Sequence, residues 1–225
     1  MNRQPTSIHP DAALRLLREG NRRFIAGTSL GIEDVEGDDR LDAFSDRQEP
    51  FAAVLGCSDS RVPVEMVFGQ GPGRLFVVRV AGNVVAPTQL GSLEFAVVEL
   101  GVRLIVVLGH SKCGAVAATL GGSASGDSHQ TGHFGAITKR ISRAVFASPE
   151  AEDDARQPEW EEAVALNVLQ SCEDLRVESP ILAELLRSGA LRVVGAVYDV
   201  ESGRVELVDD TRPSPTAVRG ASAGS

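Results

Sequence analysis

Two short segments carry the side chains of this chain that could do chemistry together. The first is Cys57-Ser58-Asp59-Ser60-Arg61, and the second, further along the chain, is His110-Ser111-Lys112-Cys113. Cys, His and Asp are side chains that hold Zn²⁺ in tetrahedral geometry. Three such ligands leave a fourth position for water, and zinc lowers the pKa of that water to about 7, which gives hydroxide at neutral pH. The two segments predict a catalytic zinc site held by Cys57, His110 and Cys113.

An apolar run with the composition of a buried strand precedes each segment. Residues 51–56 lead into the first segment and residues 104–109 into the second. In a parallel sheet both strands end at the same carboxyl edge, where open α/β sheets place their ligands. Residues two apart on an extended segment project from the same face, and residues three apart across a strand-to-helix turn can reach one ion. The spacing therefore allows both segments to share one metal.

Asp59 and Arg61 decide whether the fourth position of such a site is open. The two side chains can form a bidentate ion pair, so Arg61 competes with the metal for the carboxylate. If Arg61 holds the carboxylate, Asp59 can accept a hydrogen bond from the zinc-bound hydroxide. If zinc holds it, Asp59 becomes the fourth ligand and the site is closed. A non-catalytic zinc-binding domain closed by Asp59 is therefore the alternative, although the paired Cys-x-x-Cys spacing common in structural sites is absent here.

The two segments and their surroundings resemble the β-class carbonic anhydrases. The resemblance includes the paired segments themselves and extends to the stretches at residues 19–24, 76–83, 91–96 and 195–200, so that it covers roughly residues 11 to 208. It implies a lyase that binds one Zn²⁺ per subunit and converts CO₂ reversibly to bicarbonate and a proton. Hydrolysis of COS or CS₂ on the same zinc site is a further alternative that the motifs leave open.

The resemblance also implies roles for individual residues. Gln48 matches a glutamine whose amide N–H is donated to a substrate oxygen, and such a donor stabilises developing negative charge. Phe76, Ala81 and Gly114 match positions that line a small apolar substrate pocket. In the members that switch, low pH favours the state in which the aspartate closes the site, and we expect Asp59 to do so here.

One departure from the family concerns regulation. Some members bind bicarbonate near the zinc through a tryptophan, a glycine and a proline. Gly56 and Pro63 match two of these positions, but the third is Val54, which has no indole N–H to donate. This form of bicarbonate inhibition is therefore not expected here.

The pattern of apolar residues predicts an α/β fold. We expect a single domain over residues 9–210, between a loose N-terminus at 1–8 and a disordered tail at 211–225. Its centre is a mainly parallel β-sheet flanked by helices, with an N-terminal helical arm and a C-terminal β-hairpin. Strands are expected at 51–56, 74–81, 103–108, 191–200 and 204–208, and helices at 10–26, 63–68, 88–100, 113–120, 134–146, 160–177 and 180–188. Residues 121–128, rich in glycine and serine, predict a flexible loop.

Composition and charge restrict the partners of the chain. The formal net charge of −9 argues against nucleic-acid binding, because no basic stripe is available to neutralise phosphates. The chain has no stretch of the roughly eighteen apolar residues that a membrane helix needs, and its first residues lack the signal-peptide pattern, so we expect no membrane and a cytoplasmic location. Three dispersed cysteines do not resemble a disulfide framework and are expected as free thiols.

The expected assembly is a homodimer or a homotetramer. An uncovered edge of a parallel sheet favours association, and in the family resembled the first helix packs across onto a second subunit. Two histidines, His129 and His133, could carry protons from the site to buffer, but surface histidines without a role are common. Cys172 and Trp160 fall on late helices and are expected to be core residues.

Overall fold

A single five-stranded sheet organises the described part of the chain, which comprises residues 8–28, 48–125, 132–146 and 158–210 of this computed structural model. The strands lie in the order β2-β1-β3-β4-β5, and all neighbouring pairs are parallel except β4 with β5. Their bounds are β1 Ala52–Gly56, β2 Leu75–Arg79, β3 Leu104–His110, β4 Arg192–Tyr198 and β5 Val205–Asp209. The predicted mainly parallel sheet and C-terminal hairpin are confirmed.

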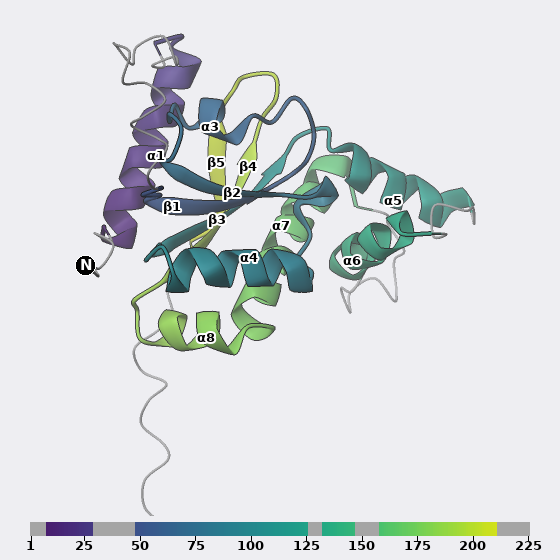
Figure 1. Ribbon diagram of the computed structural model, residues 1–225. Coiled ribbons are helices and arrows are strands. Elements are labelled where there is room, and N and C mark those ends of the chain that lie inside the picture. Colours follow the sequence, from purple (N-terminus) through teal and green to yellow (C-terminus); the bar gives the residue numbers. More distant parts are fainter. Residues whose placement is uncertain (1–7, 29–47, 126–131, 147–157, 211–225) are drawn as a thin grey trace, which may run out of the picture.

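Helix α1 (Pro10–Ile25) and the short helix α3 (Val64–Val67) cover one face of the sheet (Figure 1). Leu14 and Leu17 of α1 are buried in the same apolar cluster as Val106 of β3 and Ala196 of β4. The resemblance implied a first helix that packs across onto a second subunit. Here α1 buries its apolar face on its own sheet, because β3 and β4 present apolar side chains to it.

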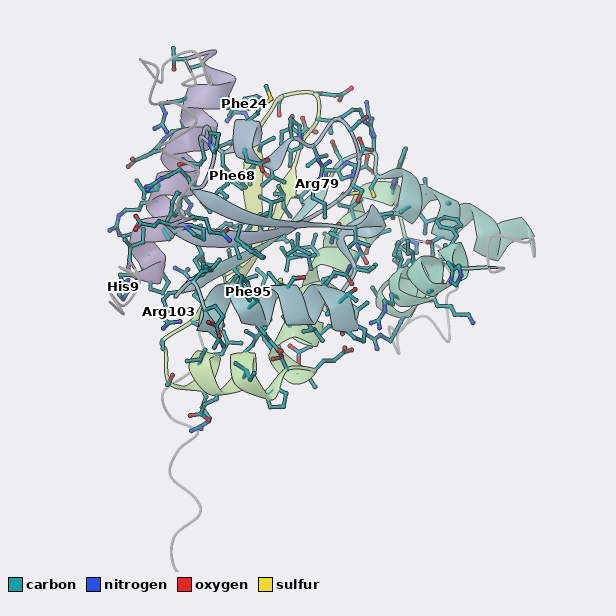
Figure 2. The ribbon with its side chains drawn as sticks, in the orientation of Figure 1. His9, Phe24, Phe68, Arg79, Phe95 and Arg103 are labelled. Carbon is teal, nitrogen blue, oxygen red and sulfur yellow. The ribbon has the colours of Figure 1, made fainter. Side chains whose placement is uncertain are left out.

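Helices α4 (Pro87–Val98), α7 (Trp160–Val177) and α8 (Pro180–Arg187) cover the opposite face. Figure 2 shows this two-sided arrangement, with Phe68 on the α1 side of the sheet and Phe95 on α4. Helix α7 approaches the sheet closely over two glycines. A Cβ at Gly109 would lie 2.5 Å from Cγ2 of Val168, and a Cβ at Gly195 would lie 2.8 Å from Cγ1 of the same valine. The glycines therefore set how near α7 packs to β3 and β4.

Beyond the carboxyl ends of the strands lie α5 (Gly114–Ser125), α6 (Phe134–Phe146) and the turn η3 (Ala81–Asn83). With the first turns of α7, they enclose a third apolar cluster that contains Cys57 and Cys113. The prediction of a loop from residue 121 is wrong at its start, because α5 continues through Ser125. Each glycine costs about 1 kcal/mol relative to alanine, but a helix already nucleated over Gly114–Leu120 gains a hydrogen bond for every residue added.

Several predictions fall outside the described residues. These are the loose N-terminus up to residue 7, the part of the expected loop from residue 126, His129 and the tail from residue 211. The division of the chain at residues 9 and 210 stays a prediction. Among the helices that the structure describes, none is both long and apolar enough to cross a membrane.

Candidate metal centre

Cys57, His110 and Cys113 meet at the carboxyl edge of the sheet. Cys57 follows the last residue of β1, His110 is the last residue of β3, and Cys113 directly precedes α5. One ligand atom from each side chain lies within 4.8 Å of the other two, and all three residues are buried. Tetrahedral zinc, with bonds of about 2.0–2.3 Å, places neighbouring ligand atoms roughly 3.3–3.8 Å apart. The cluster therefore needs only a small contraction to hold the ion.

The imidazole of His110 is oriented for metal binding. Its Nδ1 lies 2.9 Å from the carbonyl oxygen of Ser111, which can only accept, so Nδ1 carries the proton. Nε2 is then a lone-pair donor, and it is fully buried without a hydrogen-bond partner. A buried nitrogen without a partner costs free energy unless a ligand satisfies it. Two sulfurs and this nitrogen form a donor set that fits zinc.

The two thiols differ in acidity although they are neighbours. The hydrogen bond from Cys113 is the largest cause that lowers the pKa of Cys57, to about 4, against the opposing effect of burial. The same contact and burial raise the pKa of Cys113. The contact therefore favours one thiolate and one thiol, with the remaining proton between the two sulfurs. A metal ion that replaces this proton would hold both sulfurs as thiolates.

Arg61 holds Asp59 in a bidentate pair, as the sequence allowed. Nε of Arg61 lies 2.9 Å from Oδ1 and Nη2 lies 2.7 Å from Oδ2, while the Arg61 backbone N–H also donates to Oδ1. These contacts hold the pKa of Asp59 well below its usual range. The carboxylate nevertheless stays near the cluster, with Oδ2 3.9 Å from Nε2 of His110. Asp59 is thus fixed beside the metal position rather than removed from it.

Arg61 and two further side chains, Arg79 and Trp160, fix the backbone that carries the ligands. Arg79, at the end of β2 (Figure 2), donates from Nε to the carbonyl of Cys57 and from Nη2 to that of Asp59, at 3.1 and 2.7 Å. Arg61 also donates to the carbonyl of Lys112 and so links the two segments. Nε1 of Trp160 donates to the carbonyl of Cys113 at 3.1 Å.

Two of the predicted pocket residues lie beside the cluster. Ala81 precedes Gly82, whose backbone N–H donates to Sγ of Cys57 at 3.3 Å, and Gly114 begins α5 next to Cys113. The structure does not bring Gln48 or Phe76 to the cluster of the same chain.

Gln48 and Phe76 lie away from the metal position. Gln48 is exposed and precedes the amino end of β1, whereas Cys57 follows its carboxyl end. At about 3.3 Å per residue, the strand separates these ends by roughly 15 Å. Phe76 lies near the amino end of β2 and pairs in register with Ala53 of β1. Its ring is tilted against that of Phe95 of α4, with ring centroids 6.1 Å apart.

The remaining predicted residues differ in their surroundings. His133 is exposed before α6. Cys172 is fully buried on α7, and burial raises the pKa of its thiol to about 12, so the prediction of a core thiol is confirmed. Trp160 packs at the third apolar cluster but also holds Cys113, a contact that the sequence did not predict.

Sequence reasoning missed the contacts that surround the ligands. The Gly82 N–H is a backbone group and leaves no signal in the residue types. In the sequence, Arg79 appears only as a charged residue at the end of an apolar strand. This position could have indicated a role at the carboxyl edge of the sheet.

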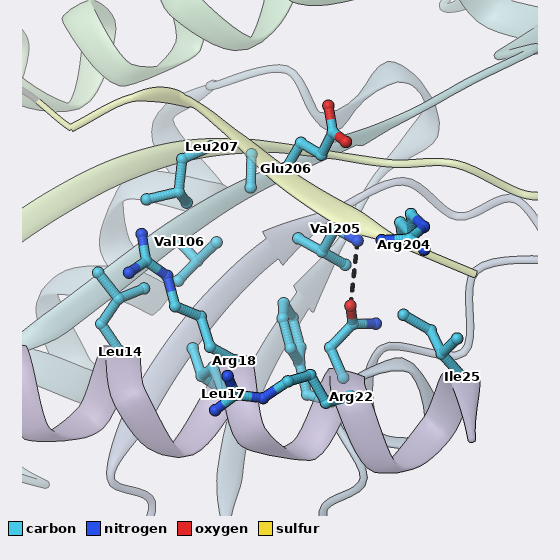
Figure 3. Close-up of a pocket in the computed structure, with 13 residues that line it drawn as sticks. Leu14, Leu17, Arg18, Arg22, Ile25, Val106, Arg204, Val205, Glu206 and Leu207 are labelled. Carbon is cyan, nitrogen blue, oxygen red and sulfur yellow. Dashed lines mark hydrogen bonds between the residues drawn. The ribbon is translucent and has the colours of Figure 1, made fainter. Parts of the chain in front are cut away.

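A separate cavity of about 300 Å³ lies between α1 and β5, on the face that α1 covers (Figure 3). Its floor is apolar and its rim carries charged side chains, namely Arg18, Arg22, Arg204 and Glu206. The lining contains no cysteine or histidine. Among the described residues, the group of three close His, Cys, Asp or Glu side chains is the cluster at the sheet edge, not this cavity.

Comparisons with known proteins agree with the geometry. A family model described as "Carbonic anhydrase" matches residues 52–205. A protein named Carbonic anhydrase from Mycolicibacterium smegmatis is 40% identical over 199 residues, which are 88% of this chain and 93% of that protein. Carbonic anhydrase 2 of Mycobacterium tuberculosis is 37% identical over 203 residues, which are 90% of this chain and 95% of that protein.

Solved structures show the same fold. The β-carbonic anhydrase of Coccomyxa, solved with acetazolamide, matches with a TM-score of 0.65 at 27% identity. The match covers 84% of this chain and 83% of the Coccomyxa chain. A β-carbonic anhydrase of Sordaria macrospora, described as tetrameric, also has a TM-score of 0.65, at 26% identity, and covers 88% of this chain and 96% of its own.

Proposed function

This chain belongs to the β-class carbonic anhydrase family, a family of zinc lyases, and we propose that it hydrates CO₂ reversibly to bicarbonate and a proton. The observation that carries the proposal is the buried cluster of Cys57, His110 and Cys113 beside a carboxylate that Arg61 holds off the metal position. A purely structural zinc site would need neither Asp59 nor Arg61. Their arrangement therefore favours an open, catalytic site over one closed by Asp59.

Each residue of the site has its own proposed role in the reaction. Cys57, His110 and Cys113 hold the metal, and zinc, when bound, supplies a Lewis acid that lowers the pKa of a water ligand to about 7. Asp59 accepts a hydrogen bond from the attacking oxygen and so orients its lone pair toward the substrate carbon. Arg61 keeps the Asp59 carboxylate ionised and in place, because its guanidinium binds both carboxylate oxygens.

Substrate contacts need a second copy of the chain. Gln48 cannot reach the cluster of its own chain, so we assign the donation of an amide N–H to a substrate oxygen to Gln48 of a neighbouring copy. An apolar surface for that copy lies beside the open edge of β2, where Phe95 and Val98 of α4 are 47% and 56% exposed. A homodimer or a higher assembly in the cytoplasm is the expected state, and Ala81 and Gly114 are proposed to line the substrate pocket.

Stopped-flow measurement of CO₂ hydration with a pH indicator, over roughly pH 6.5–9, tests the proposal on protein of known zinc content. Fast turnover is expected in the parent protein, with a loss of about a hundredfold in Asp59→Asn, which keeps the shape but not the charge. Zinc-loaded protein that is inactive on CO₂ at every pH would contradict the proposal. Activity on COS in the same preparation would then favour the hydrolase alternative, and inactivity on both would favour the closed zinc domain.

A further inference from the structure

We infer that Asn167 and Ser171 of α7 are positioning residues of the metal centre. They hold the turn Ala81–Asn83 so that the backbone N–H of Gly82 donates to Sγ of Cys57. The inference rests on the proposed function only in taking Cys57 as a metal ligand.

The backbone conformation of this turn is unfavourable and needs support from its surroundings. Gly82 and Asn83 have φ values of 68° and 43°, two successive residues in the left-handed region. Asn83 is not glycine, so its conformation costs free energy that the surroundings must offset. The turn is also tightly packed, since a Cβ at Gly82 would lie 2.8 Å from Cδ1 of Ile141 on α6.

Two side chains of α7 hold this turn from one side. Nδ2 of Asn167 donates to the carbonyl of Gly82 at 2.7 Å, and Oγ of Ser171 donates to the carbonyl of Asn83 at 3.1 Å. The two donors stand one helical turn apart, so a single rigid element fixes two successive carbonyls. Both side chains are buried.

On its other side the turn faces the metal ligand. With its carbonyl held by Asn167, Gly82 directs its N–H at Sγ of Cys57, at 3.3 Å. A hydrogen bond to a thiolate is charge-assisted, and it fixes both the direction of the sulfur and its electron density. Groups that orient a ligand in this way contribute to metal affinity.

The choice of polar residues on this buried face supports the inference. The neighbouring positions Val164, Val168 and Cys172 on the same face of α7 pack into the apolar core. Burying an amide and a hydroxyl among them costs free energy unless each is hydrogen-bonded. Packing alone would be served by apolar side chains, so the polar pair is explained by the carbonyls that it holds.

Zinc affinity measured by chelator competition tests the inference. For Asn167→Ala we expect a zinc dissociation constant raised by about tenfold, and for Ser171→Ala a smaller rise, since its hydrogen bond is longer and one residue further from the ligand. Ser171→Thr, which keeps the hydroxyl, should have the same zinc dissociation constant as the parent. Cys172→Ala is the matched control, because it removes fully buried volume from the same helix without touching the turn, and its zinc affinity should equal that of the parent.

Cobalt substitution gives a second readout that does not depend on activity. Loss of the N–H···S hydrogen bond makes the thiolate easier to oxidise, so the thiolate-to-Co²⁺ charge-transfer band should move to longer wavelength in Asn167→Ala and stay in place in Cys172→Ala. Folded Asn167→Ala protein with parental zinc affinity and an unmoved band would overturn the inference. If Asn167→Ala does not fold, Ser171→Ala decides by the same two measurements.

These outcomes separate the inference from the proposed function. Weakened zinc binding in the variants of a parent that does not hydrate CO₂ would support the positioning role and contradict the function. Normal zinc binding in the variants of an active parent would contradict only the positioning role.

Discussion

Substitution of Gly109 by alanine should disturb both the stability of the fold and the metal centre. The new Cβ would lie 2.5 Å from Cγ2 of Val168 and 3.4 Å from Cγ1 of Val164, both on α7. Carbon atoms in ordinary contact are about 3.5–4.0 Å apart, so α7 or the end of β3 must move by roughly 1 Å. Because Gly109 is bonded to His110, a shift of the strand end also displaces Nε2 from the two sulfurs.

The magnitude follows from the clash. Overpacking of this kind costs about 1–3 kcal/mol, and for a chain of this size each kcal/mol lowers Tm by about 2–4 °C. A fall of roughly 2–12 °C is therefore expected for metal-free Gly109→Ala. Zinc affinity should fall as well, by about tenfold, because the imidazole is the only nitrogen ligand of the cluster.

Thermal melts of the metal-free protein and chelator competition measure the two effects separately. Gly195→Ala is the matched control, since its Cβ would lie 2.8 Å from Cγ1 of the same Val168 but in the middle of β4, away from the ligands. It should lower Tm similarly and reduce zinc affinity less than Gly109→Ala does, because it can disturb the site only through α7 and not through the strand end that carries His110. In Gly109→Ala/Val168→Ala the removed methyls make room for the Cβ, so the two changes should be non-additive by about 1 kcal/mol or more. Parental melting of Gly109→Ala, or equal loss of zinc in Gly195→Ala, would refute the reasoning.

Other expectations follow from the same contacts. Arg61→Gln should lower the rate of CO₂ hydration at neutral pH by about tenfold, because the released Asp59 can approach the metal. Hydration at the parental rate would show that Arg61 does not act through Asp59. The pKa of Asp59 is lower in the folded state than its unfolded-state value of 3.8. Its contribution to stability is therefore fully present above pH 3.8 and is lost only as the pH falls through the lower folded-state pKa. The Tm difference between parent and Asp59→Asn should be constant from pH 8 to pH 5, and a change within that window would contradict the assignment. Trp160→Phe should cost about 1 kcal/mol through its lost hydrogen bond to Cys113, and the fluorescence of this single tryptophan should change when a chelator removes zinc from the parent. Cys172 should resist thiol reagents at pH 8 in the native protein and react only in denaturant, because burial raises its pKa to about 12; peptide mapping after labelling checks this.

The parts of the fold that the sequence could predict are those with local causes. Apolar runs bounded by glycine and proline predicted the strands, and Cys57, His110 and Cys113 could be assigned to one site because parallel strands end at one edge. The pairing of Asp59 with Arg61 followed from their spacing.

The contacts that could not be predicted join residues far apart in the sequence. Asn167 and Ser171 leave no signal of their role in the sequence, because only the packing of α7 on the sheet brings them to Gly82 and Asn83. The burial of α1 on its own sheet was missed for a similar reason, because which chain a helix covers depends on tertiary packing rather than on its own periodicity. The continuation of α5 past Leu120 was missed because glycine and serine content outweighed a helix that had already started.

The measurement that tests the central claim most directly is the rate of CO₂ hydration during titration of metal-free protein with zinc. The account predicts a rate that rises linearly and stops rising at one zinc per chain, with no rise in His110→Ala titrated in parallel. Full hydration activity in metal-free protein, or a rate that rises equally in His110→Ala, would contradict a catalytic zinc site at Cys57, His110 and Cys113.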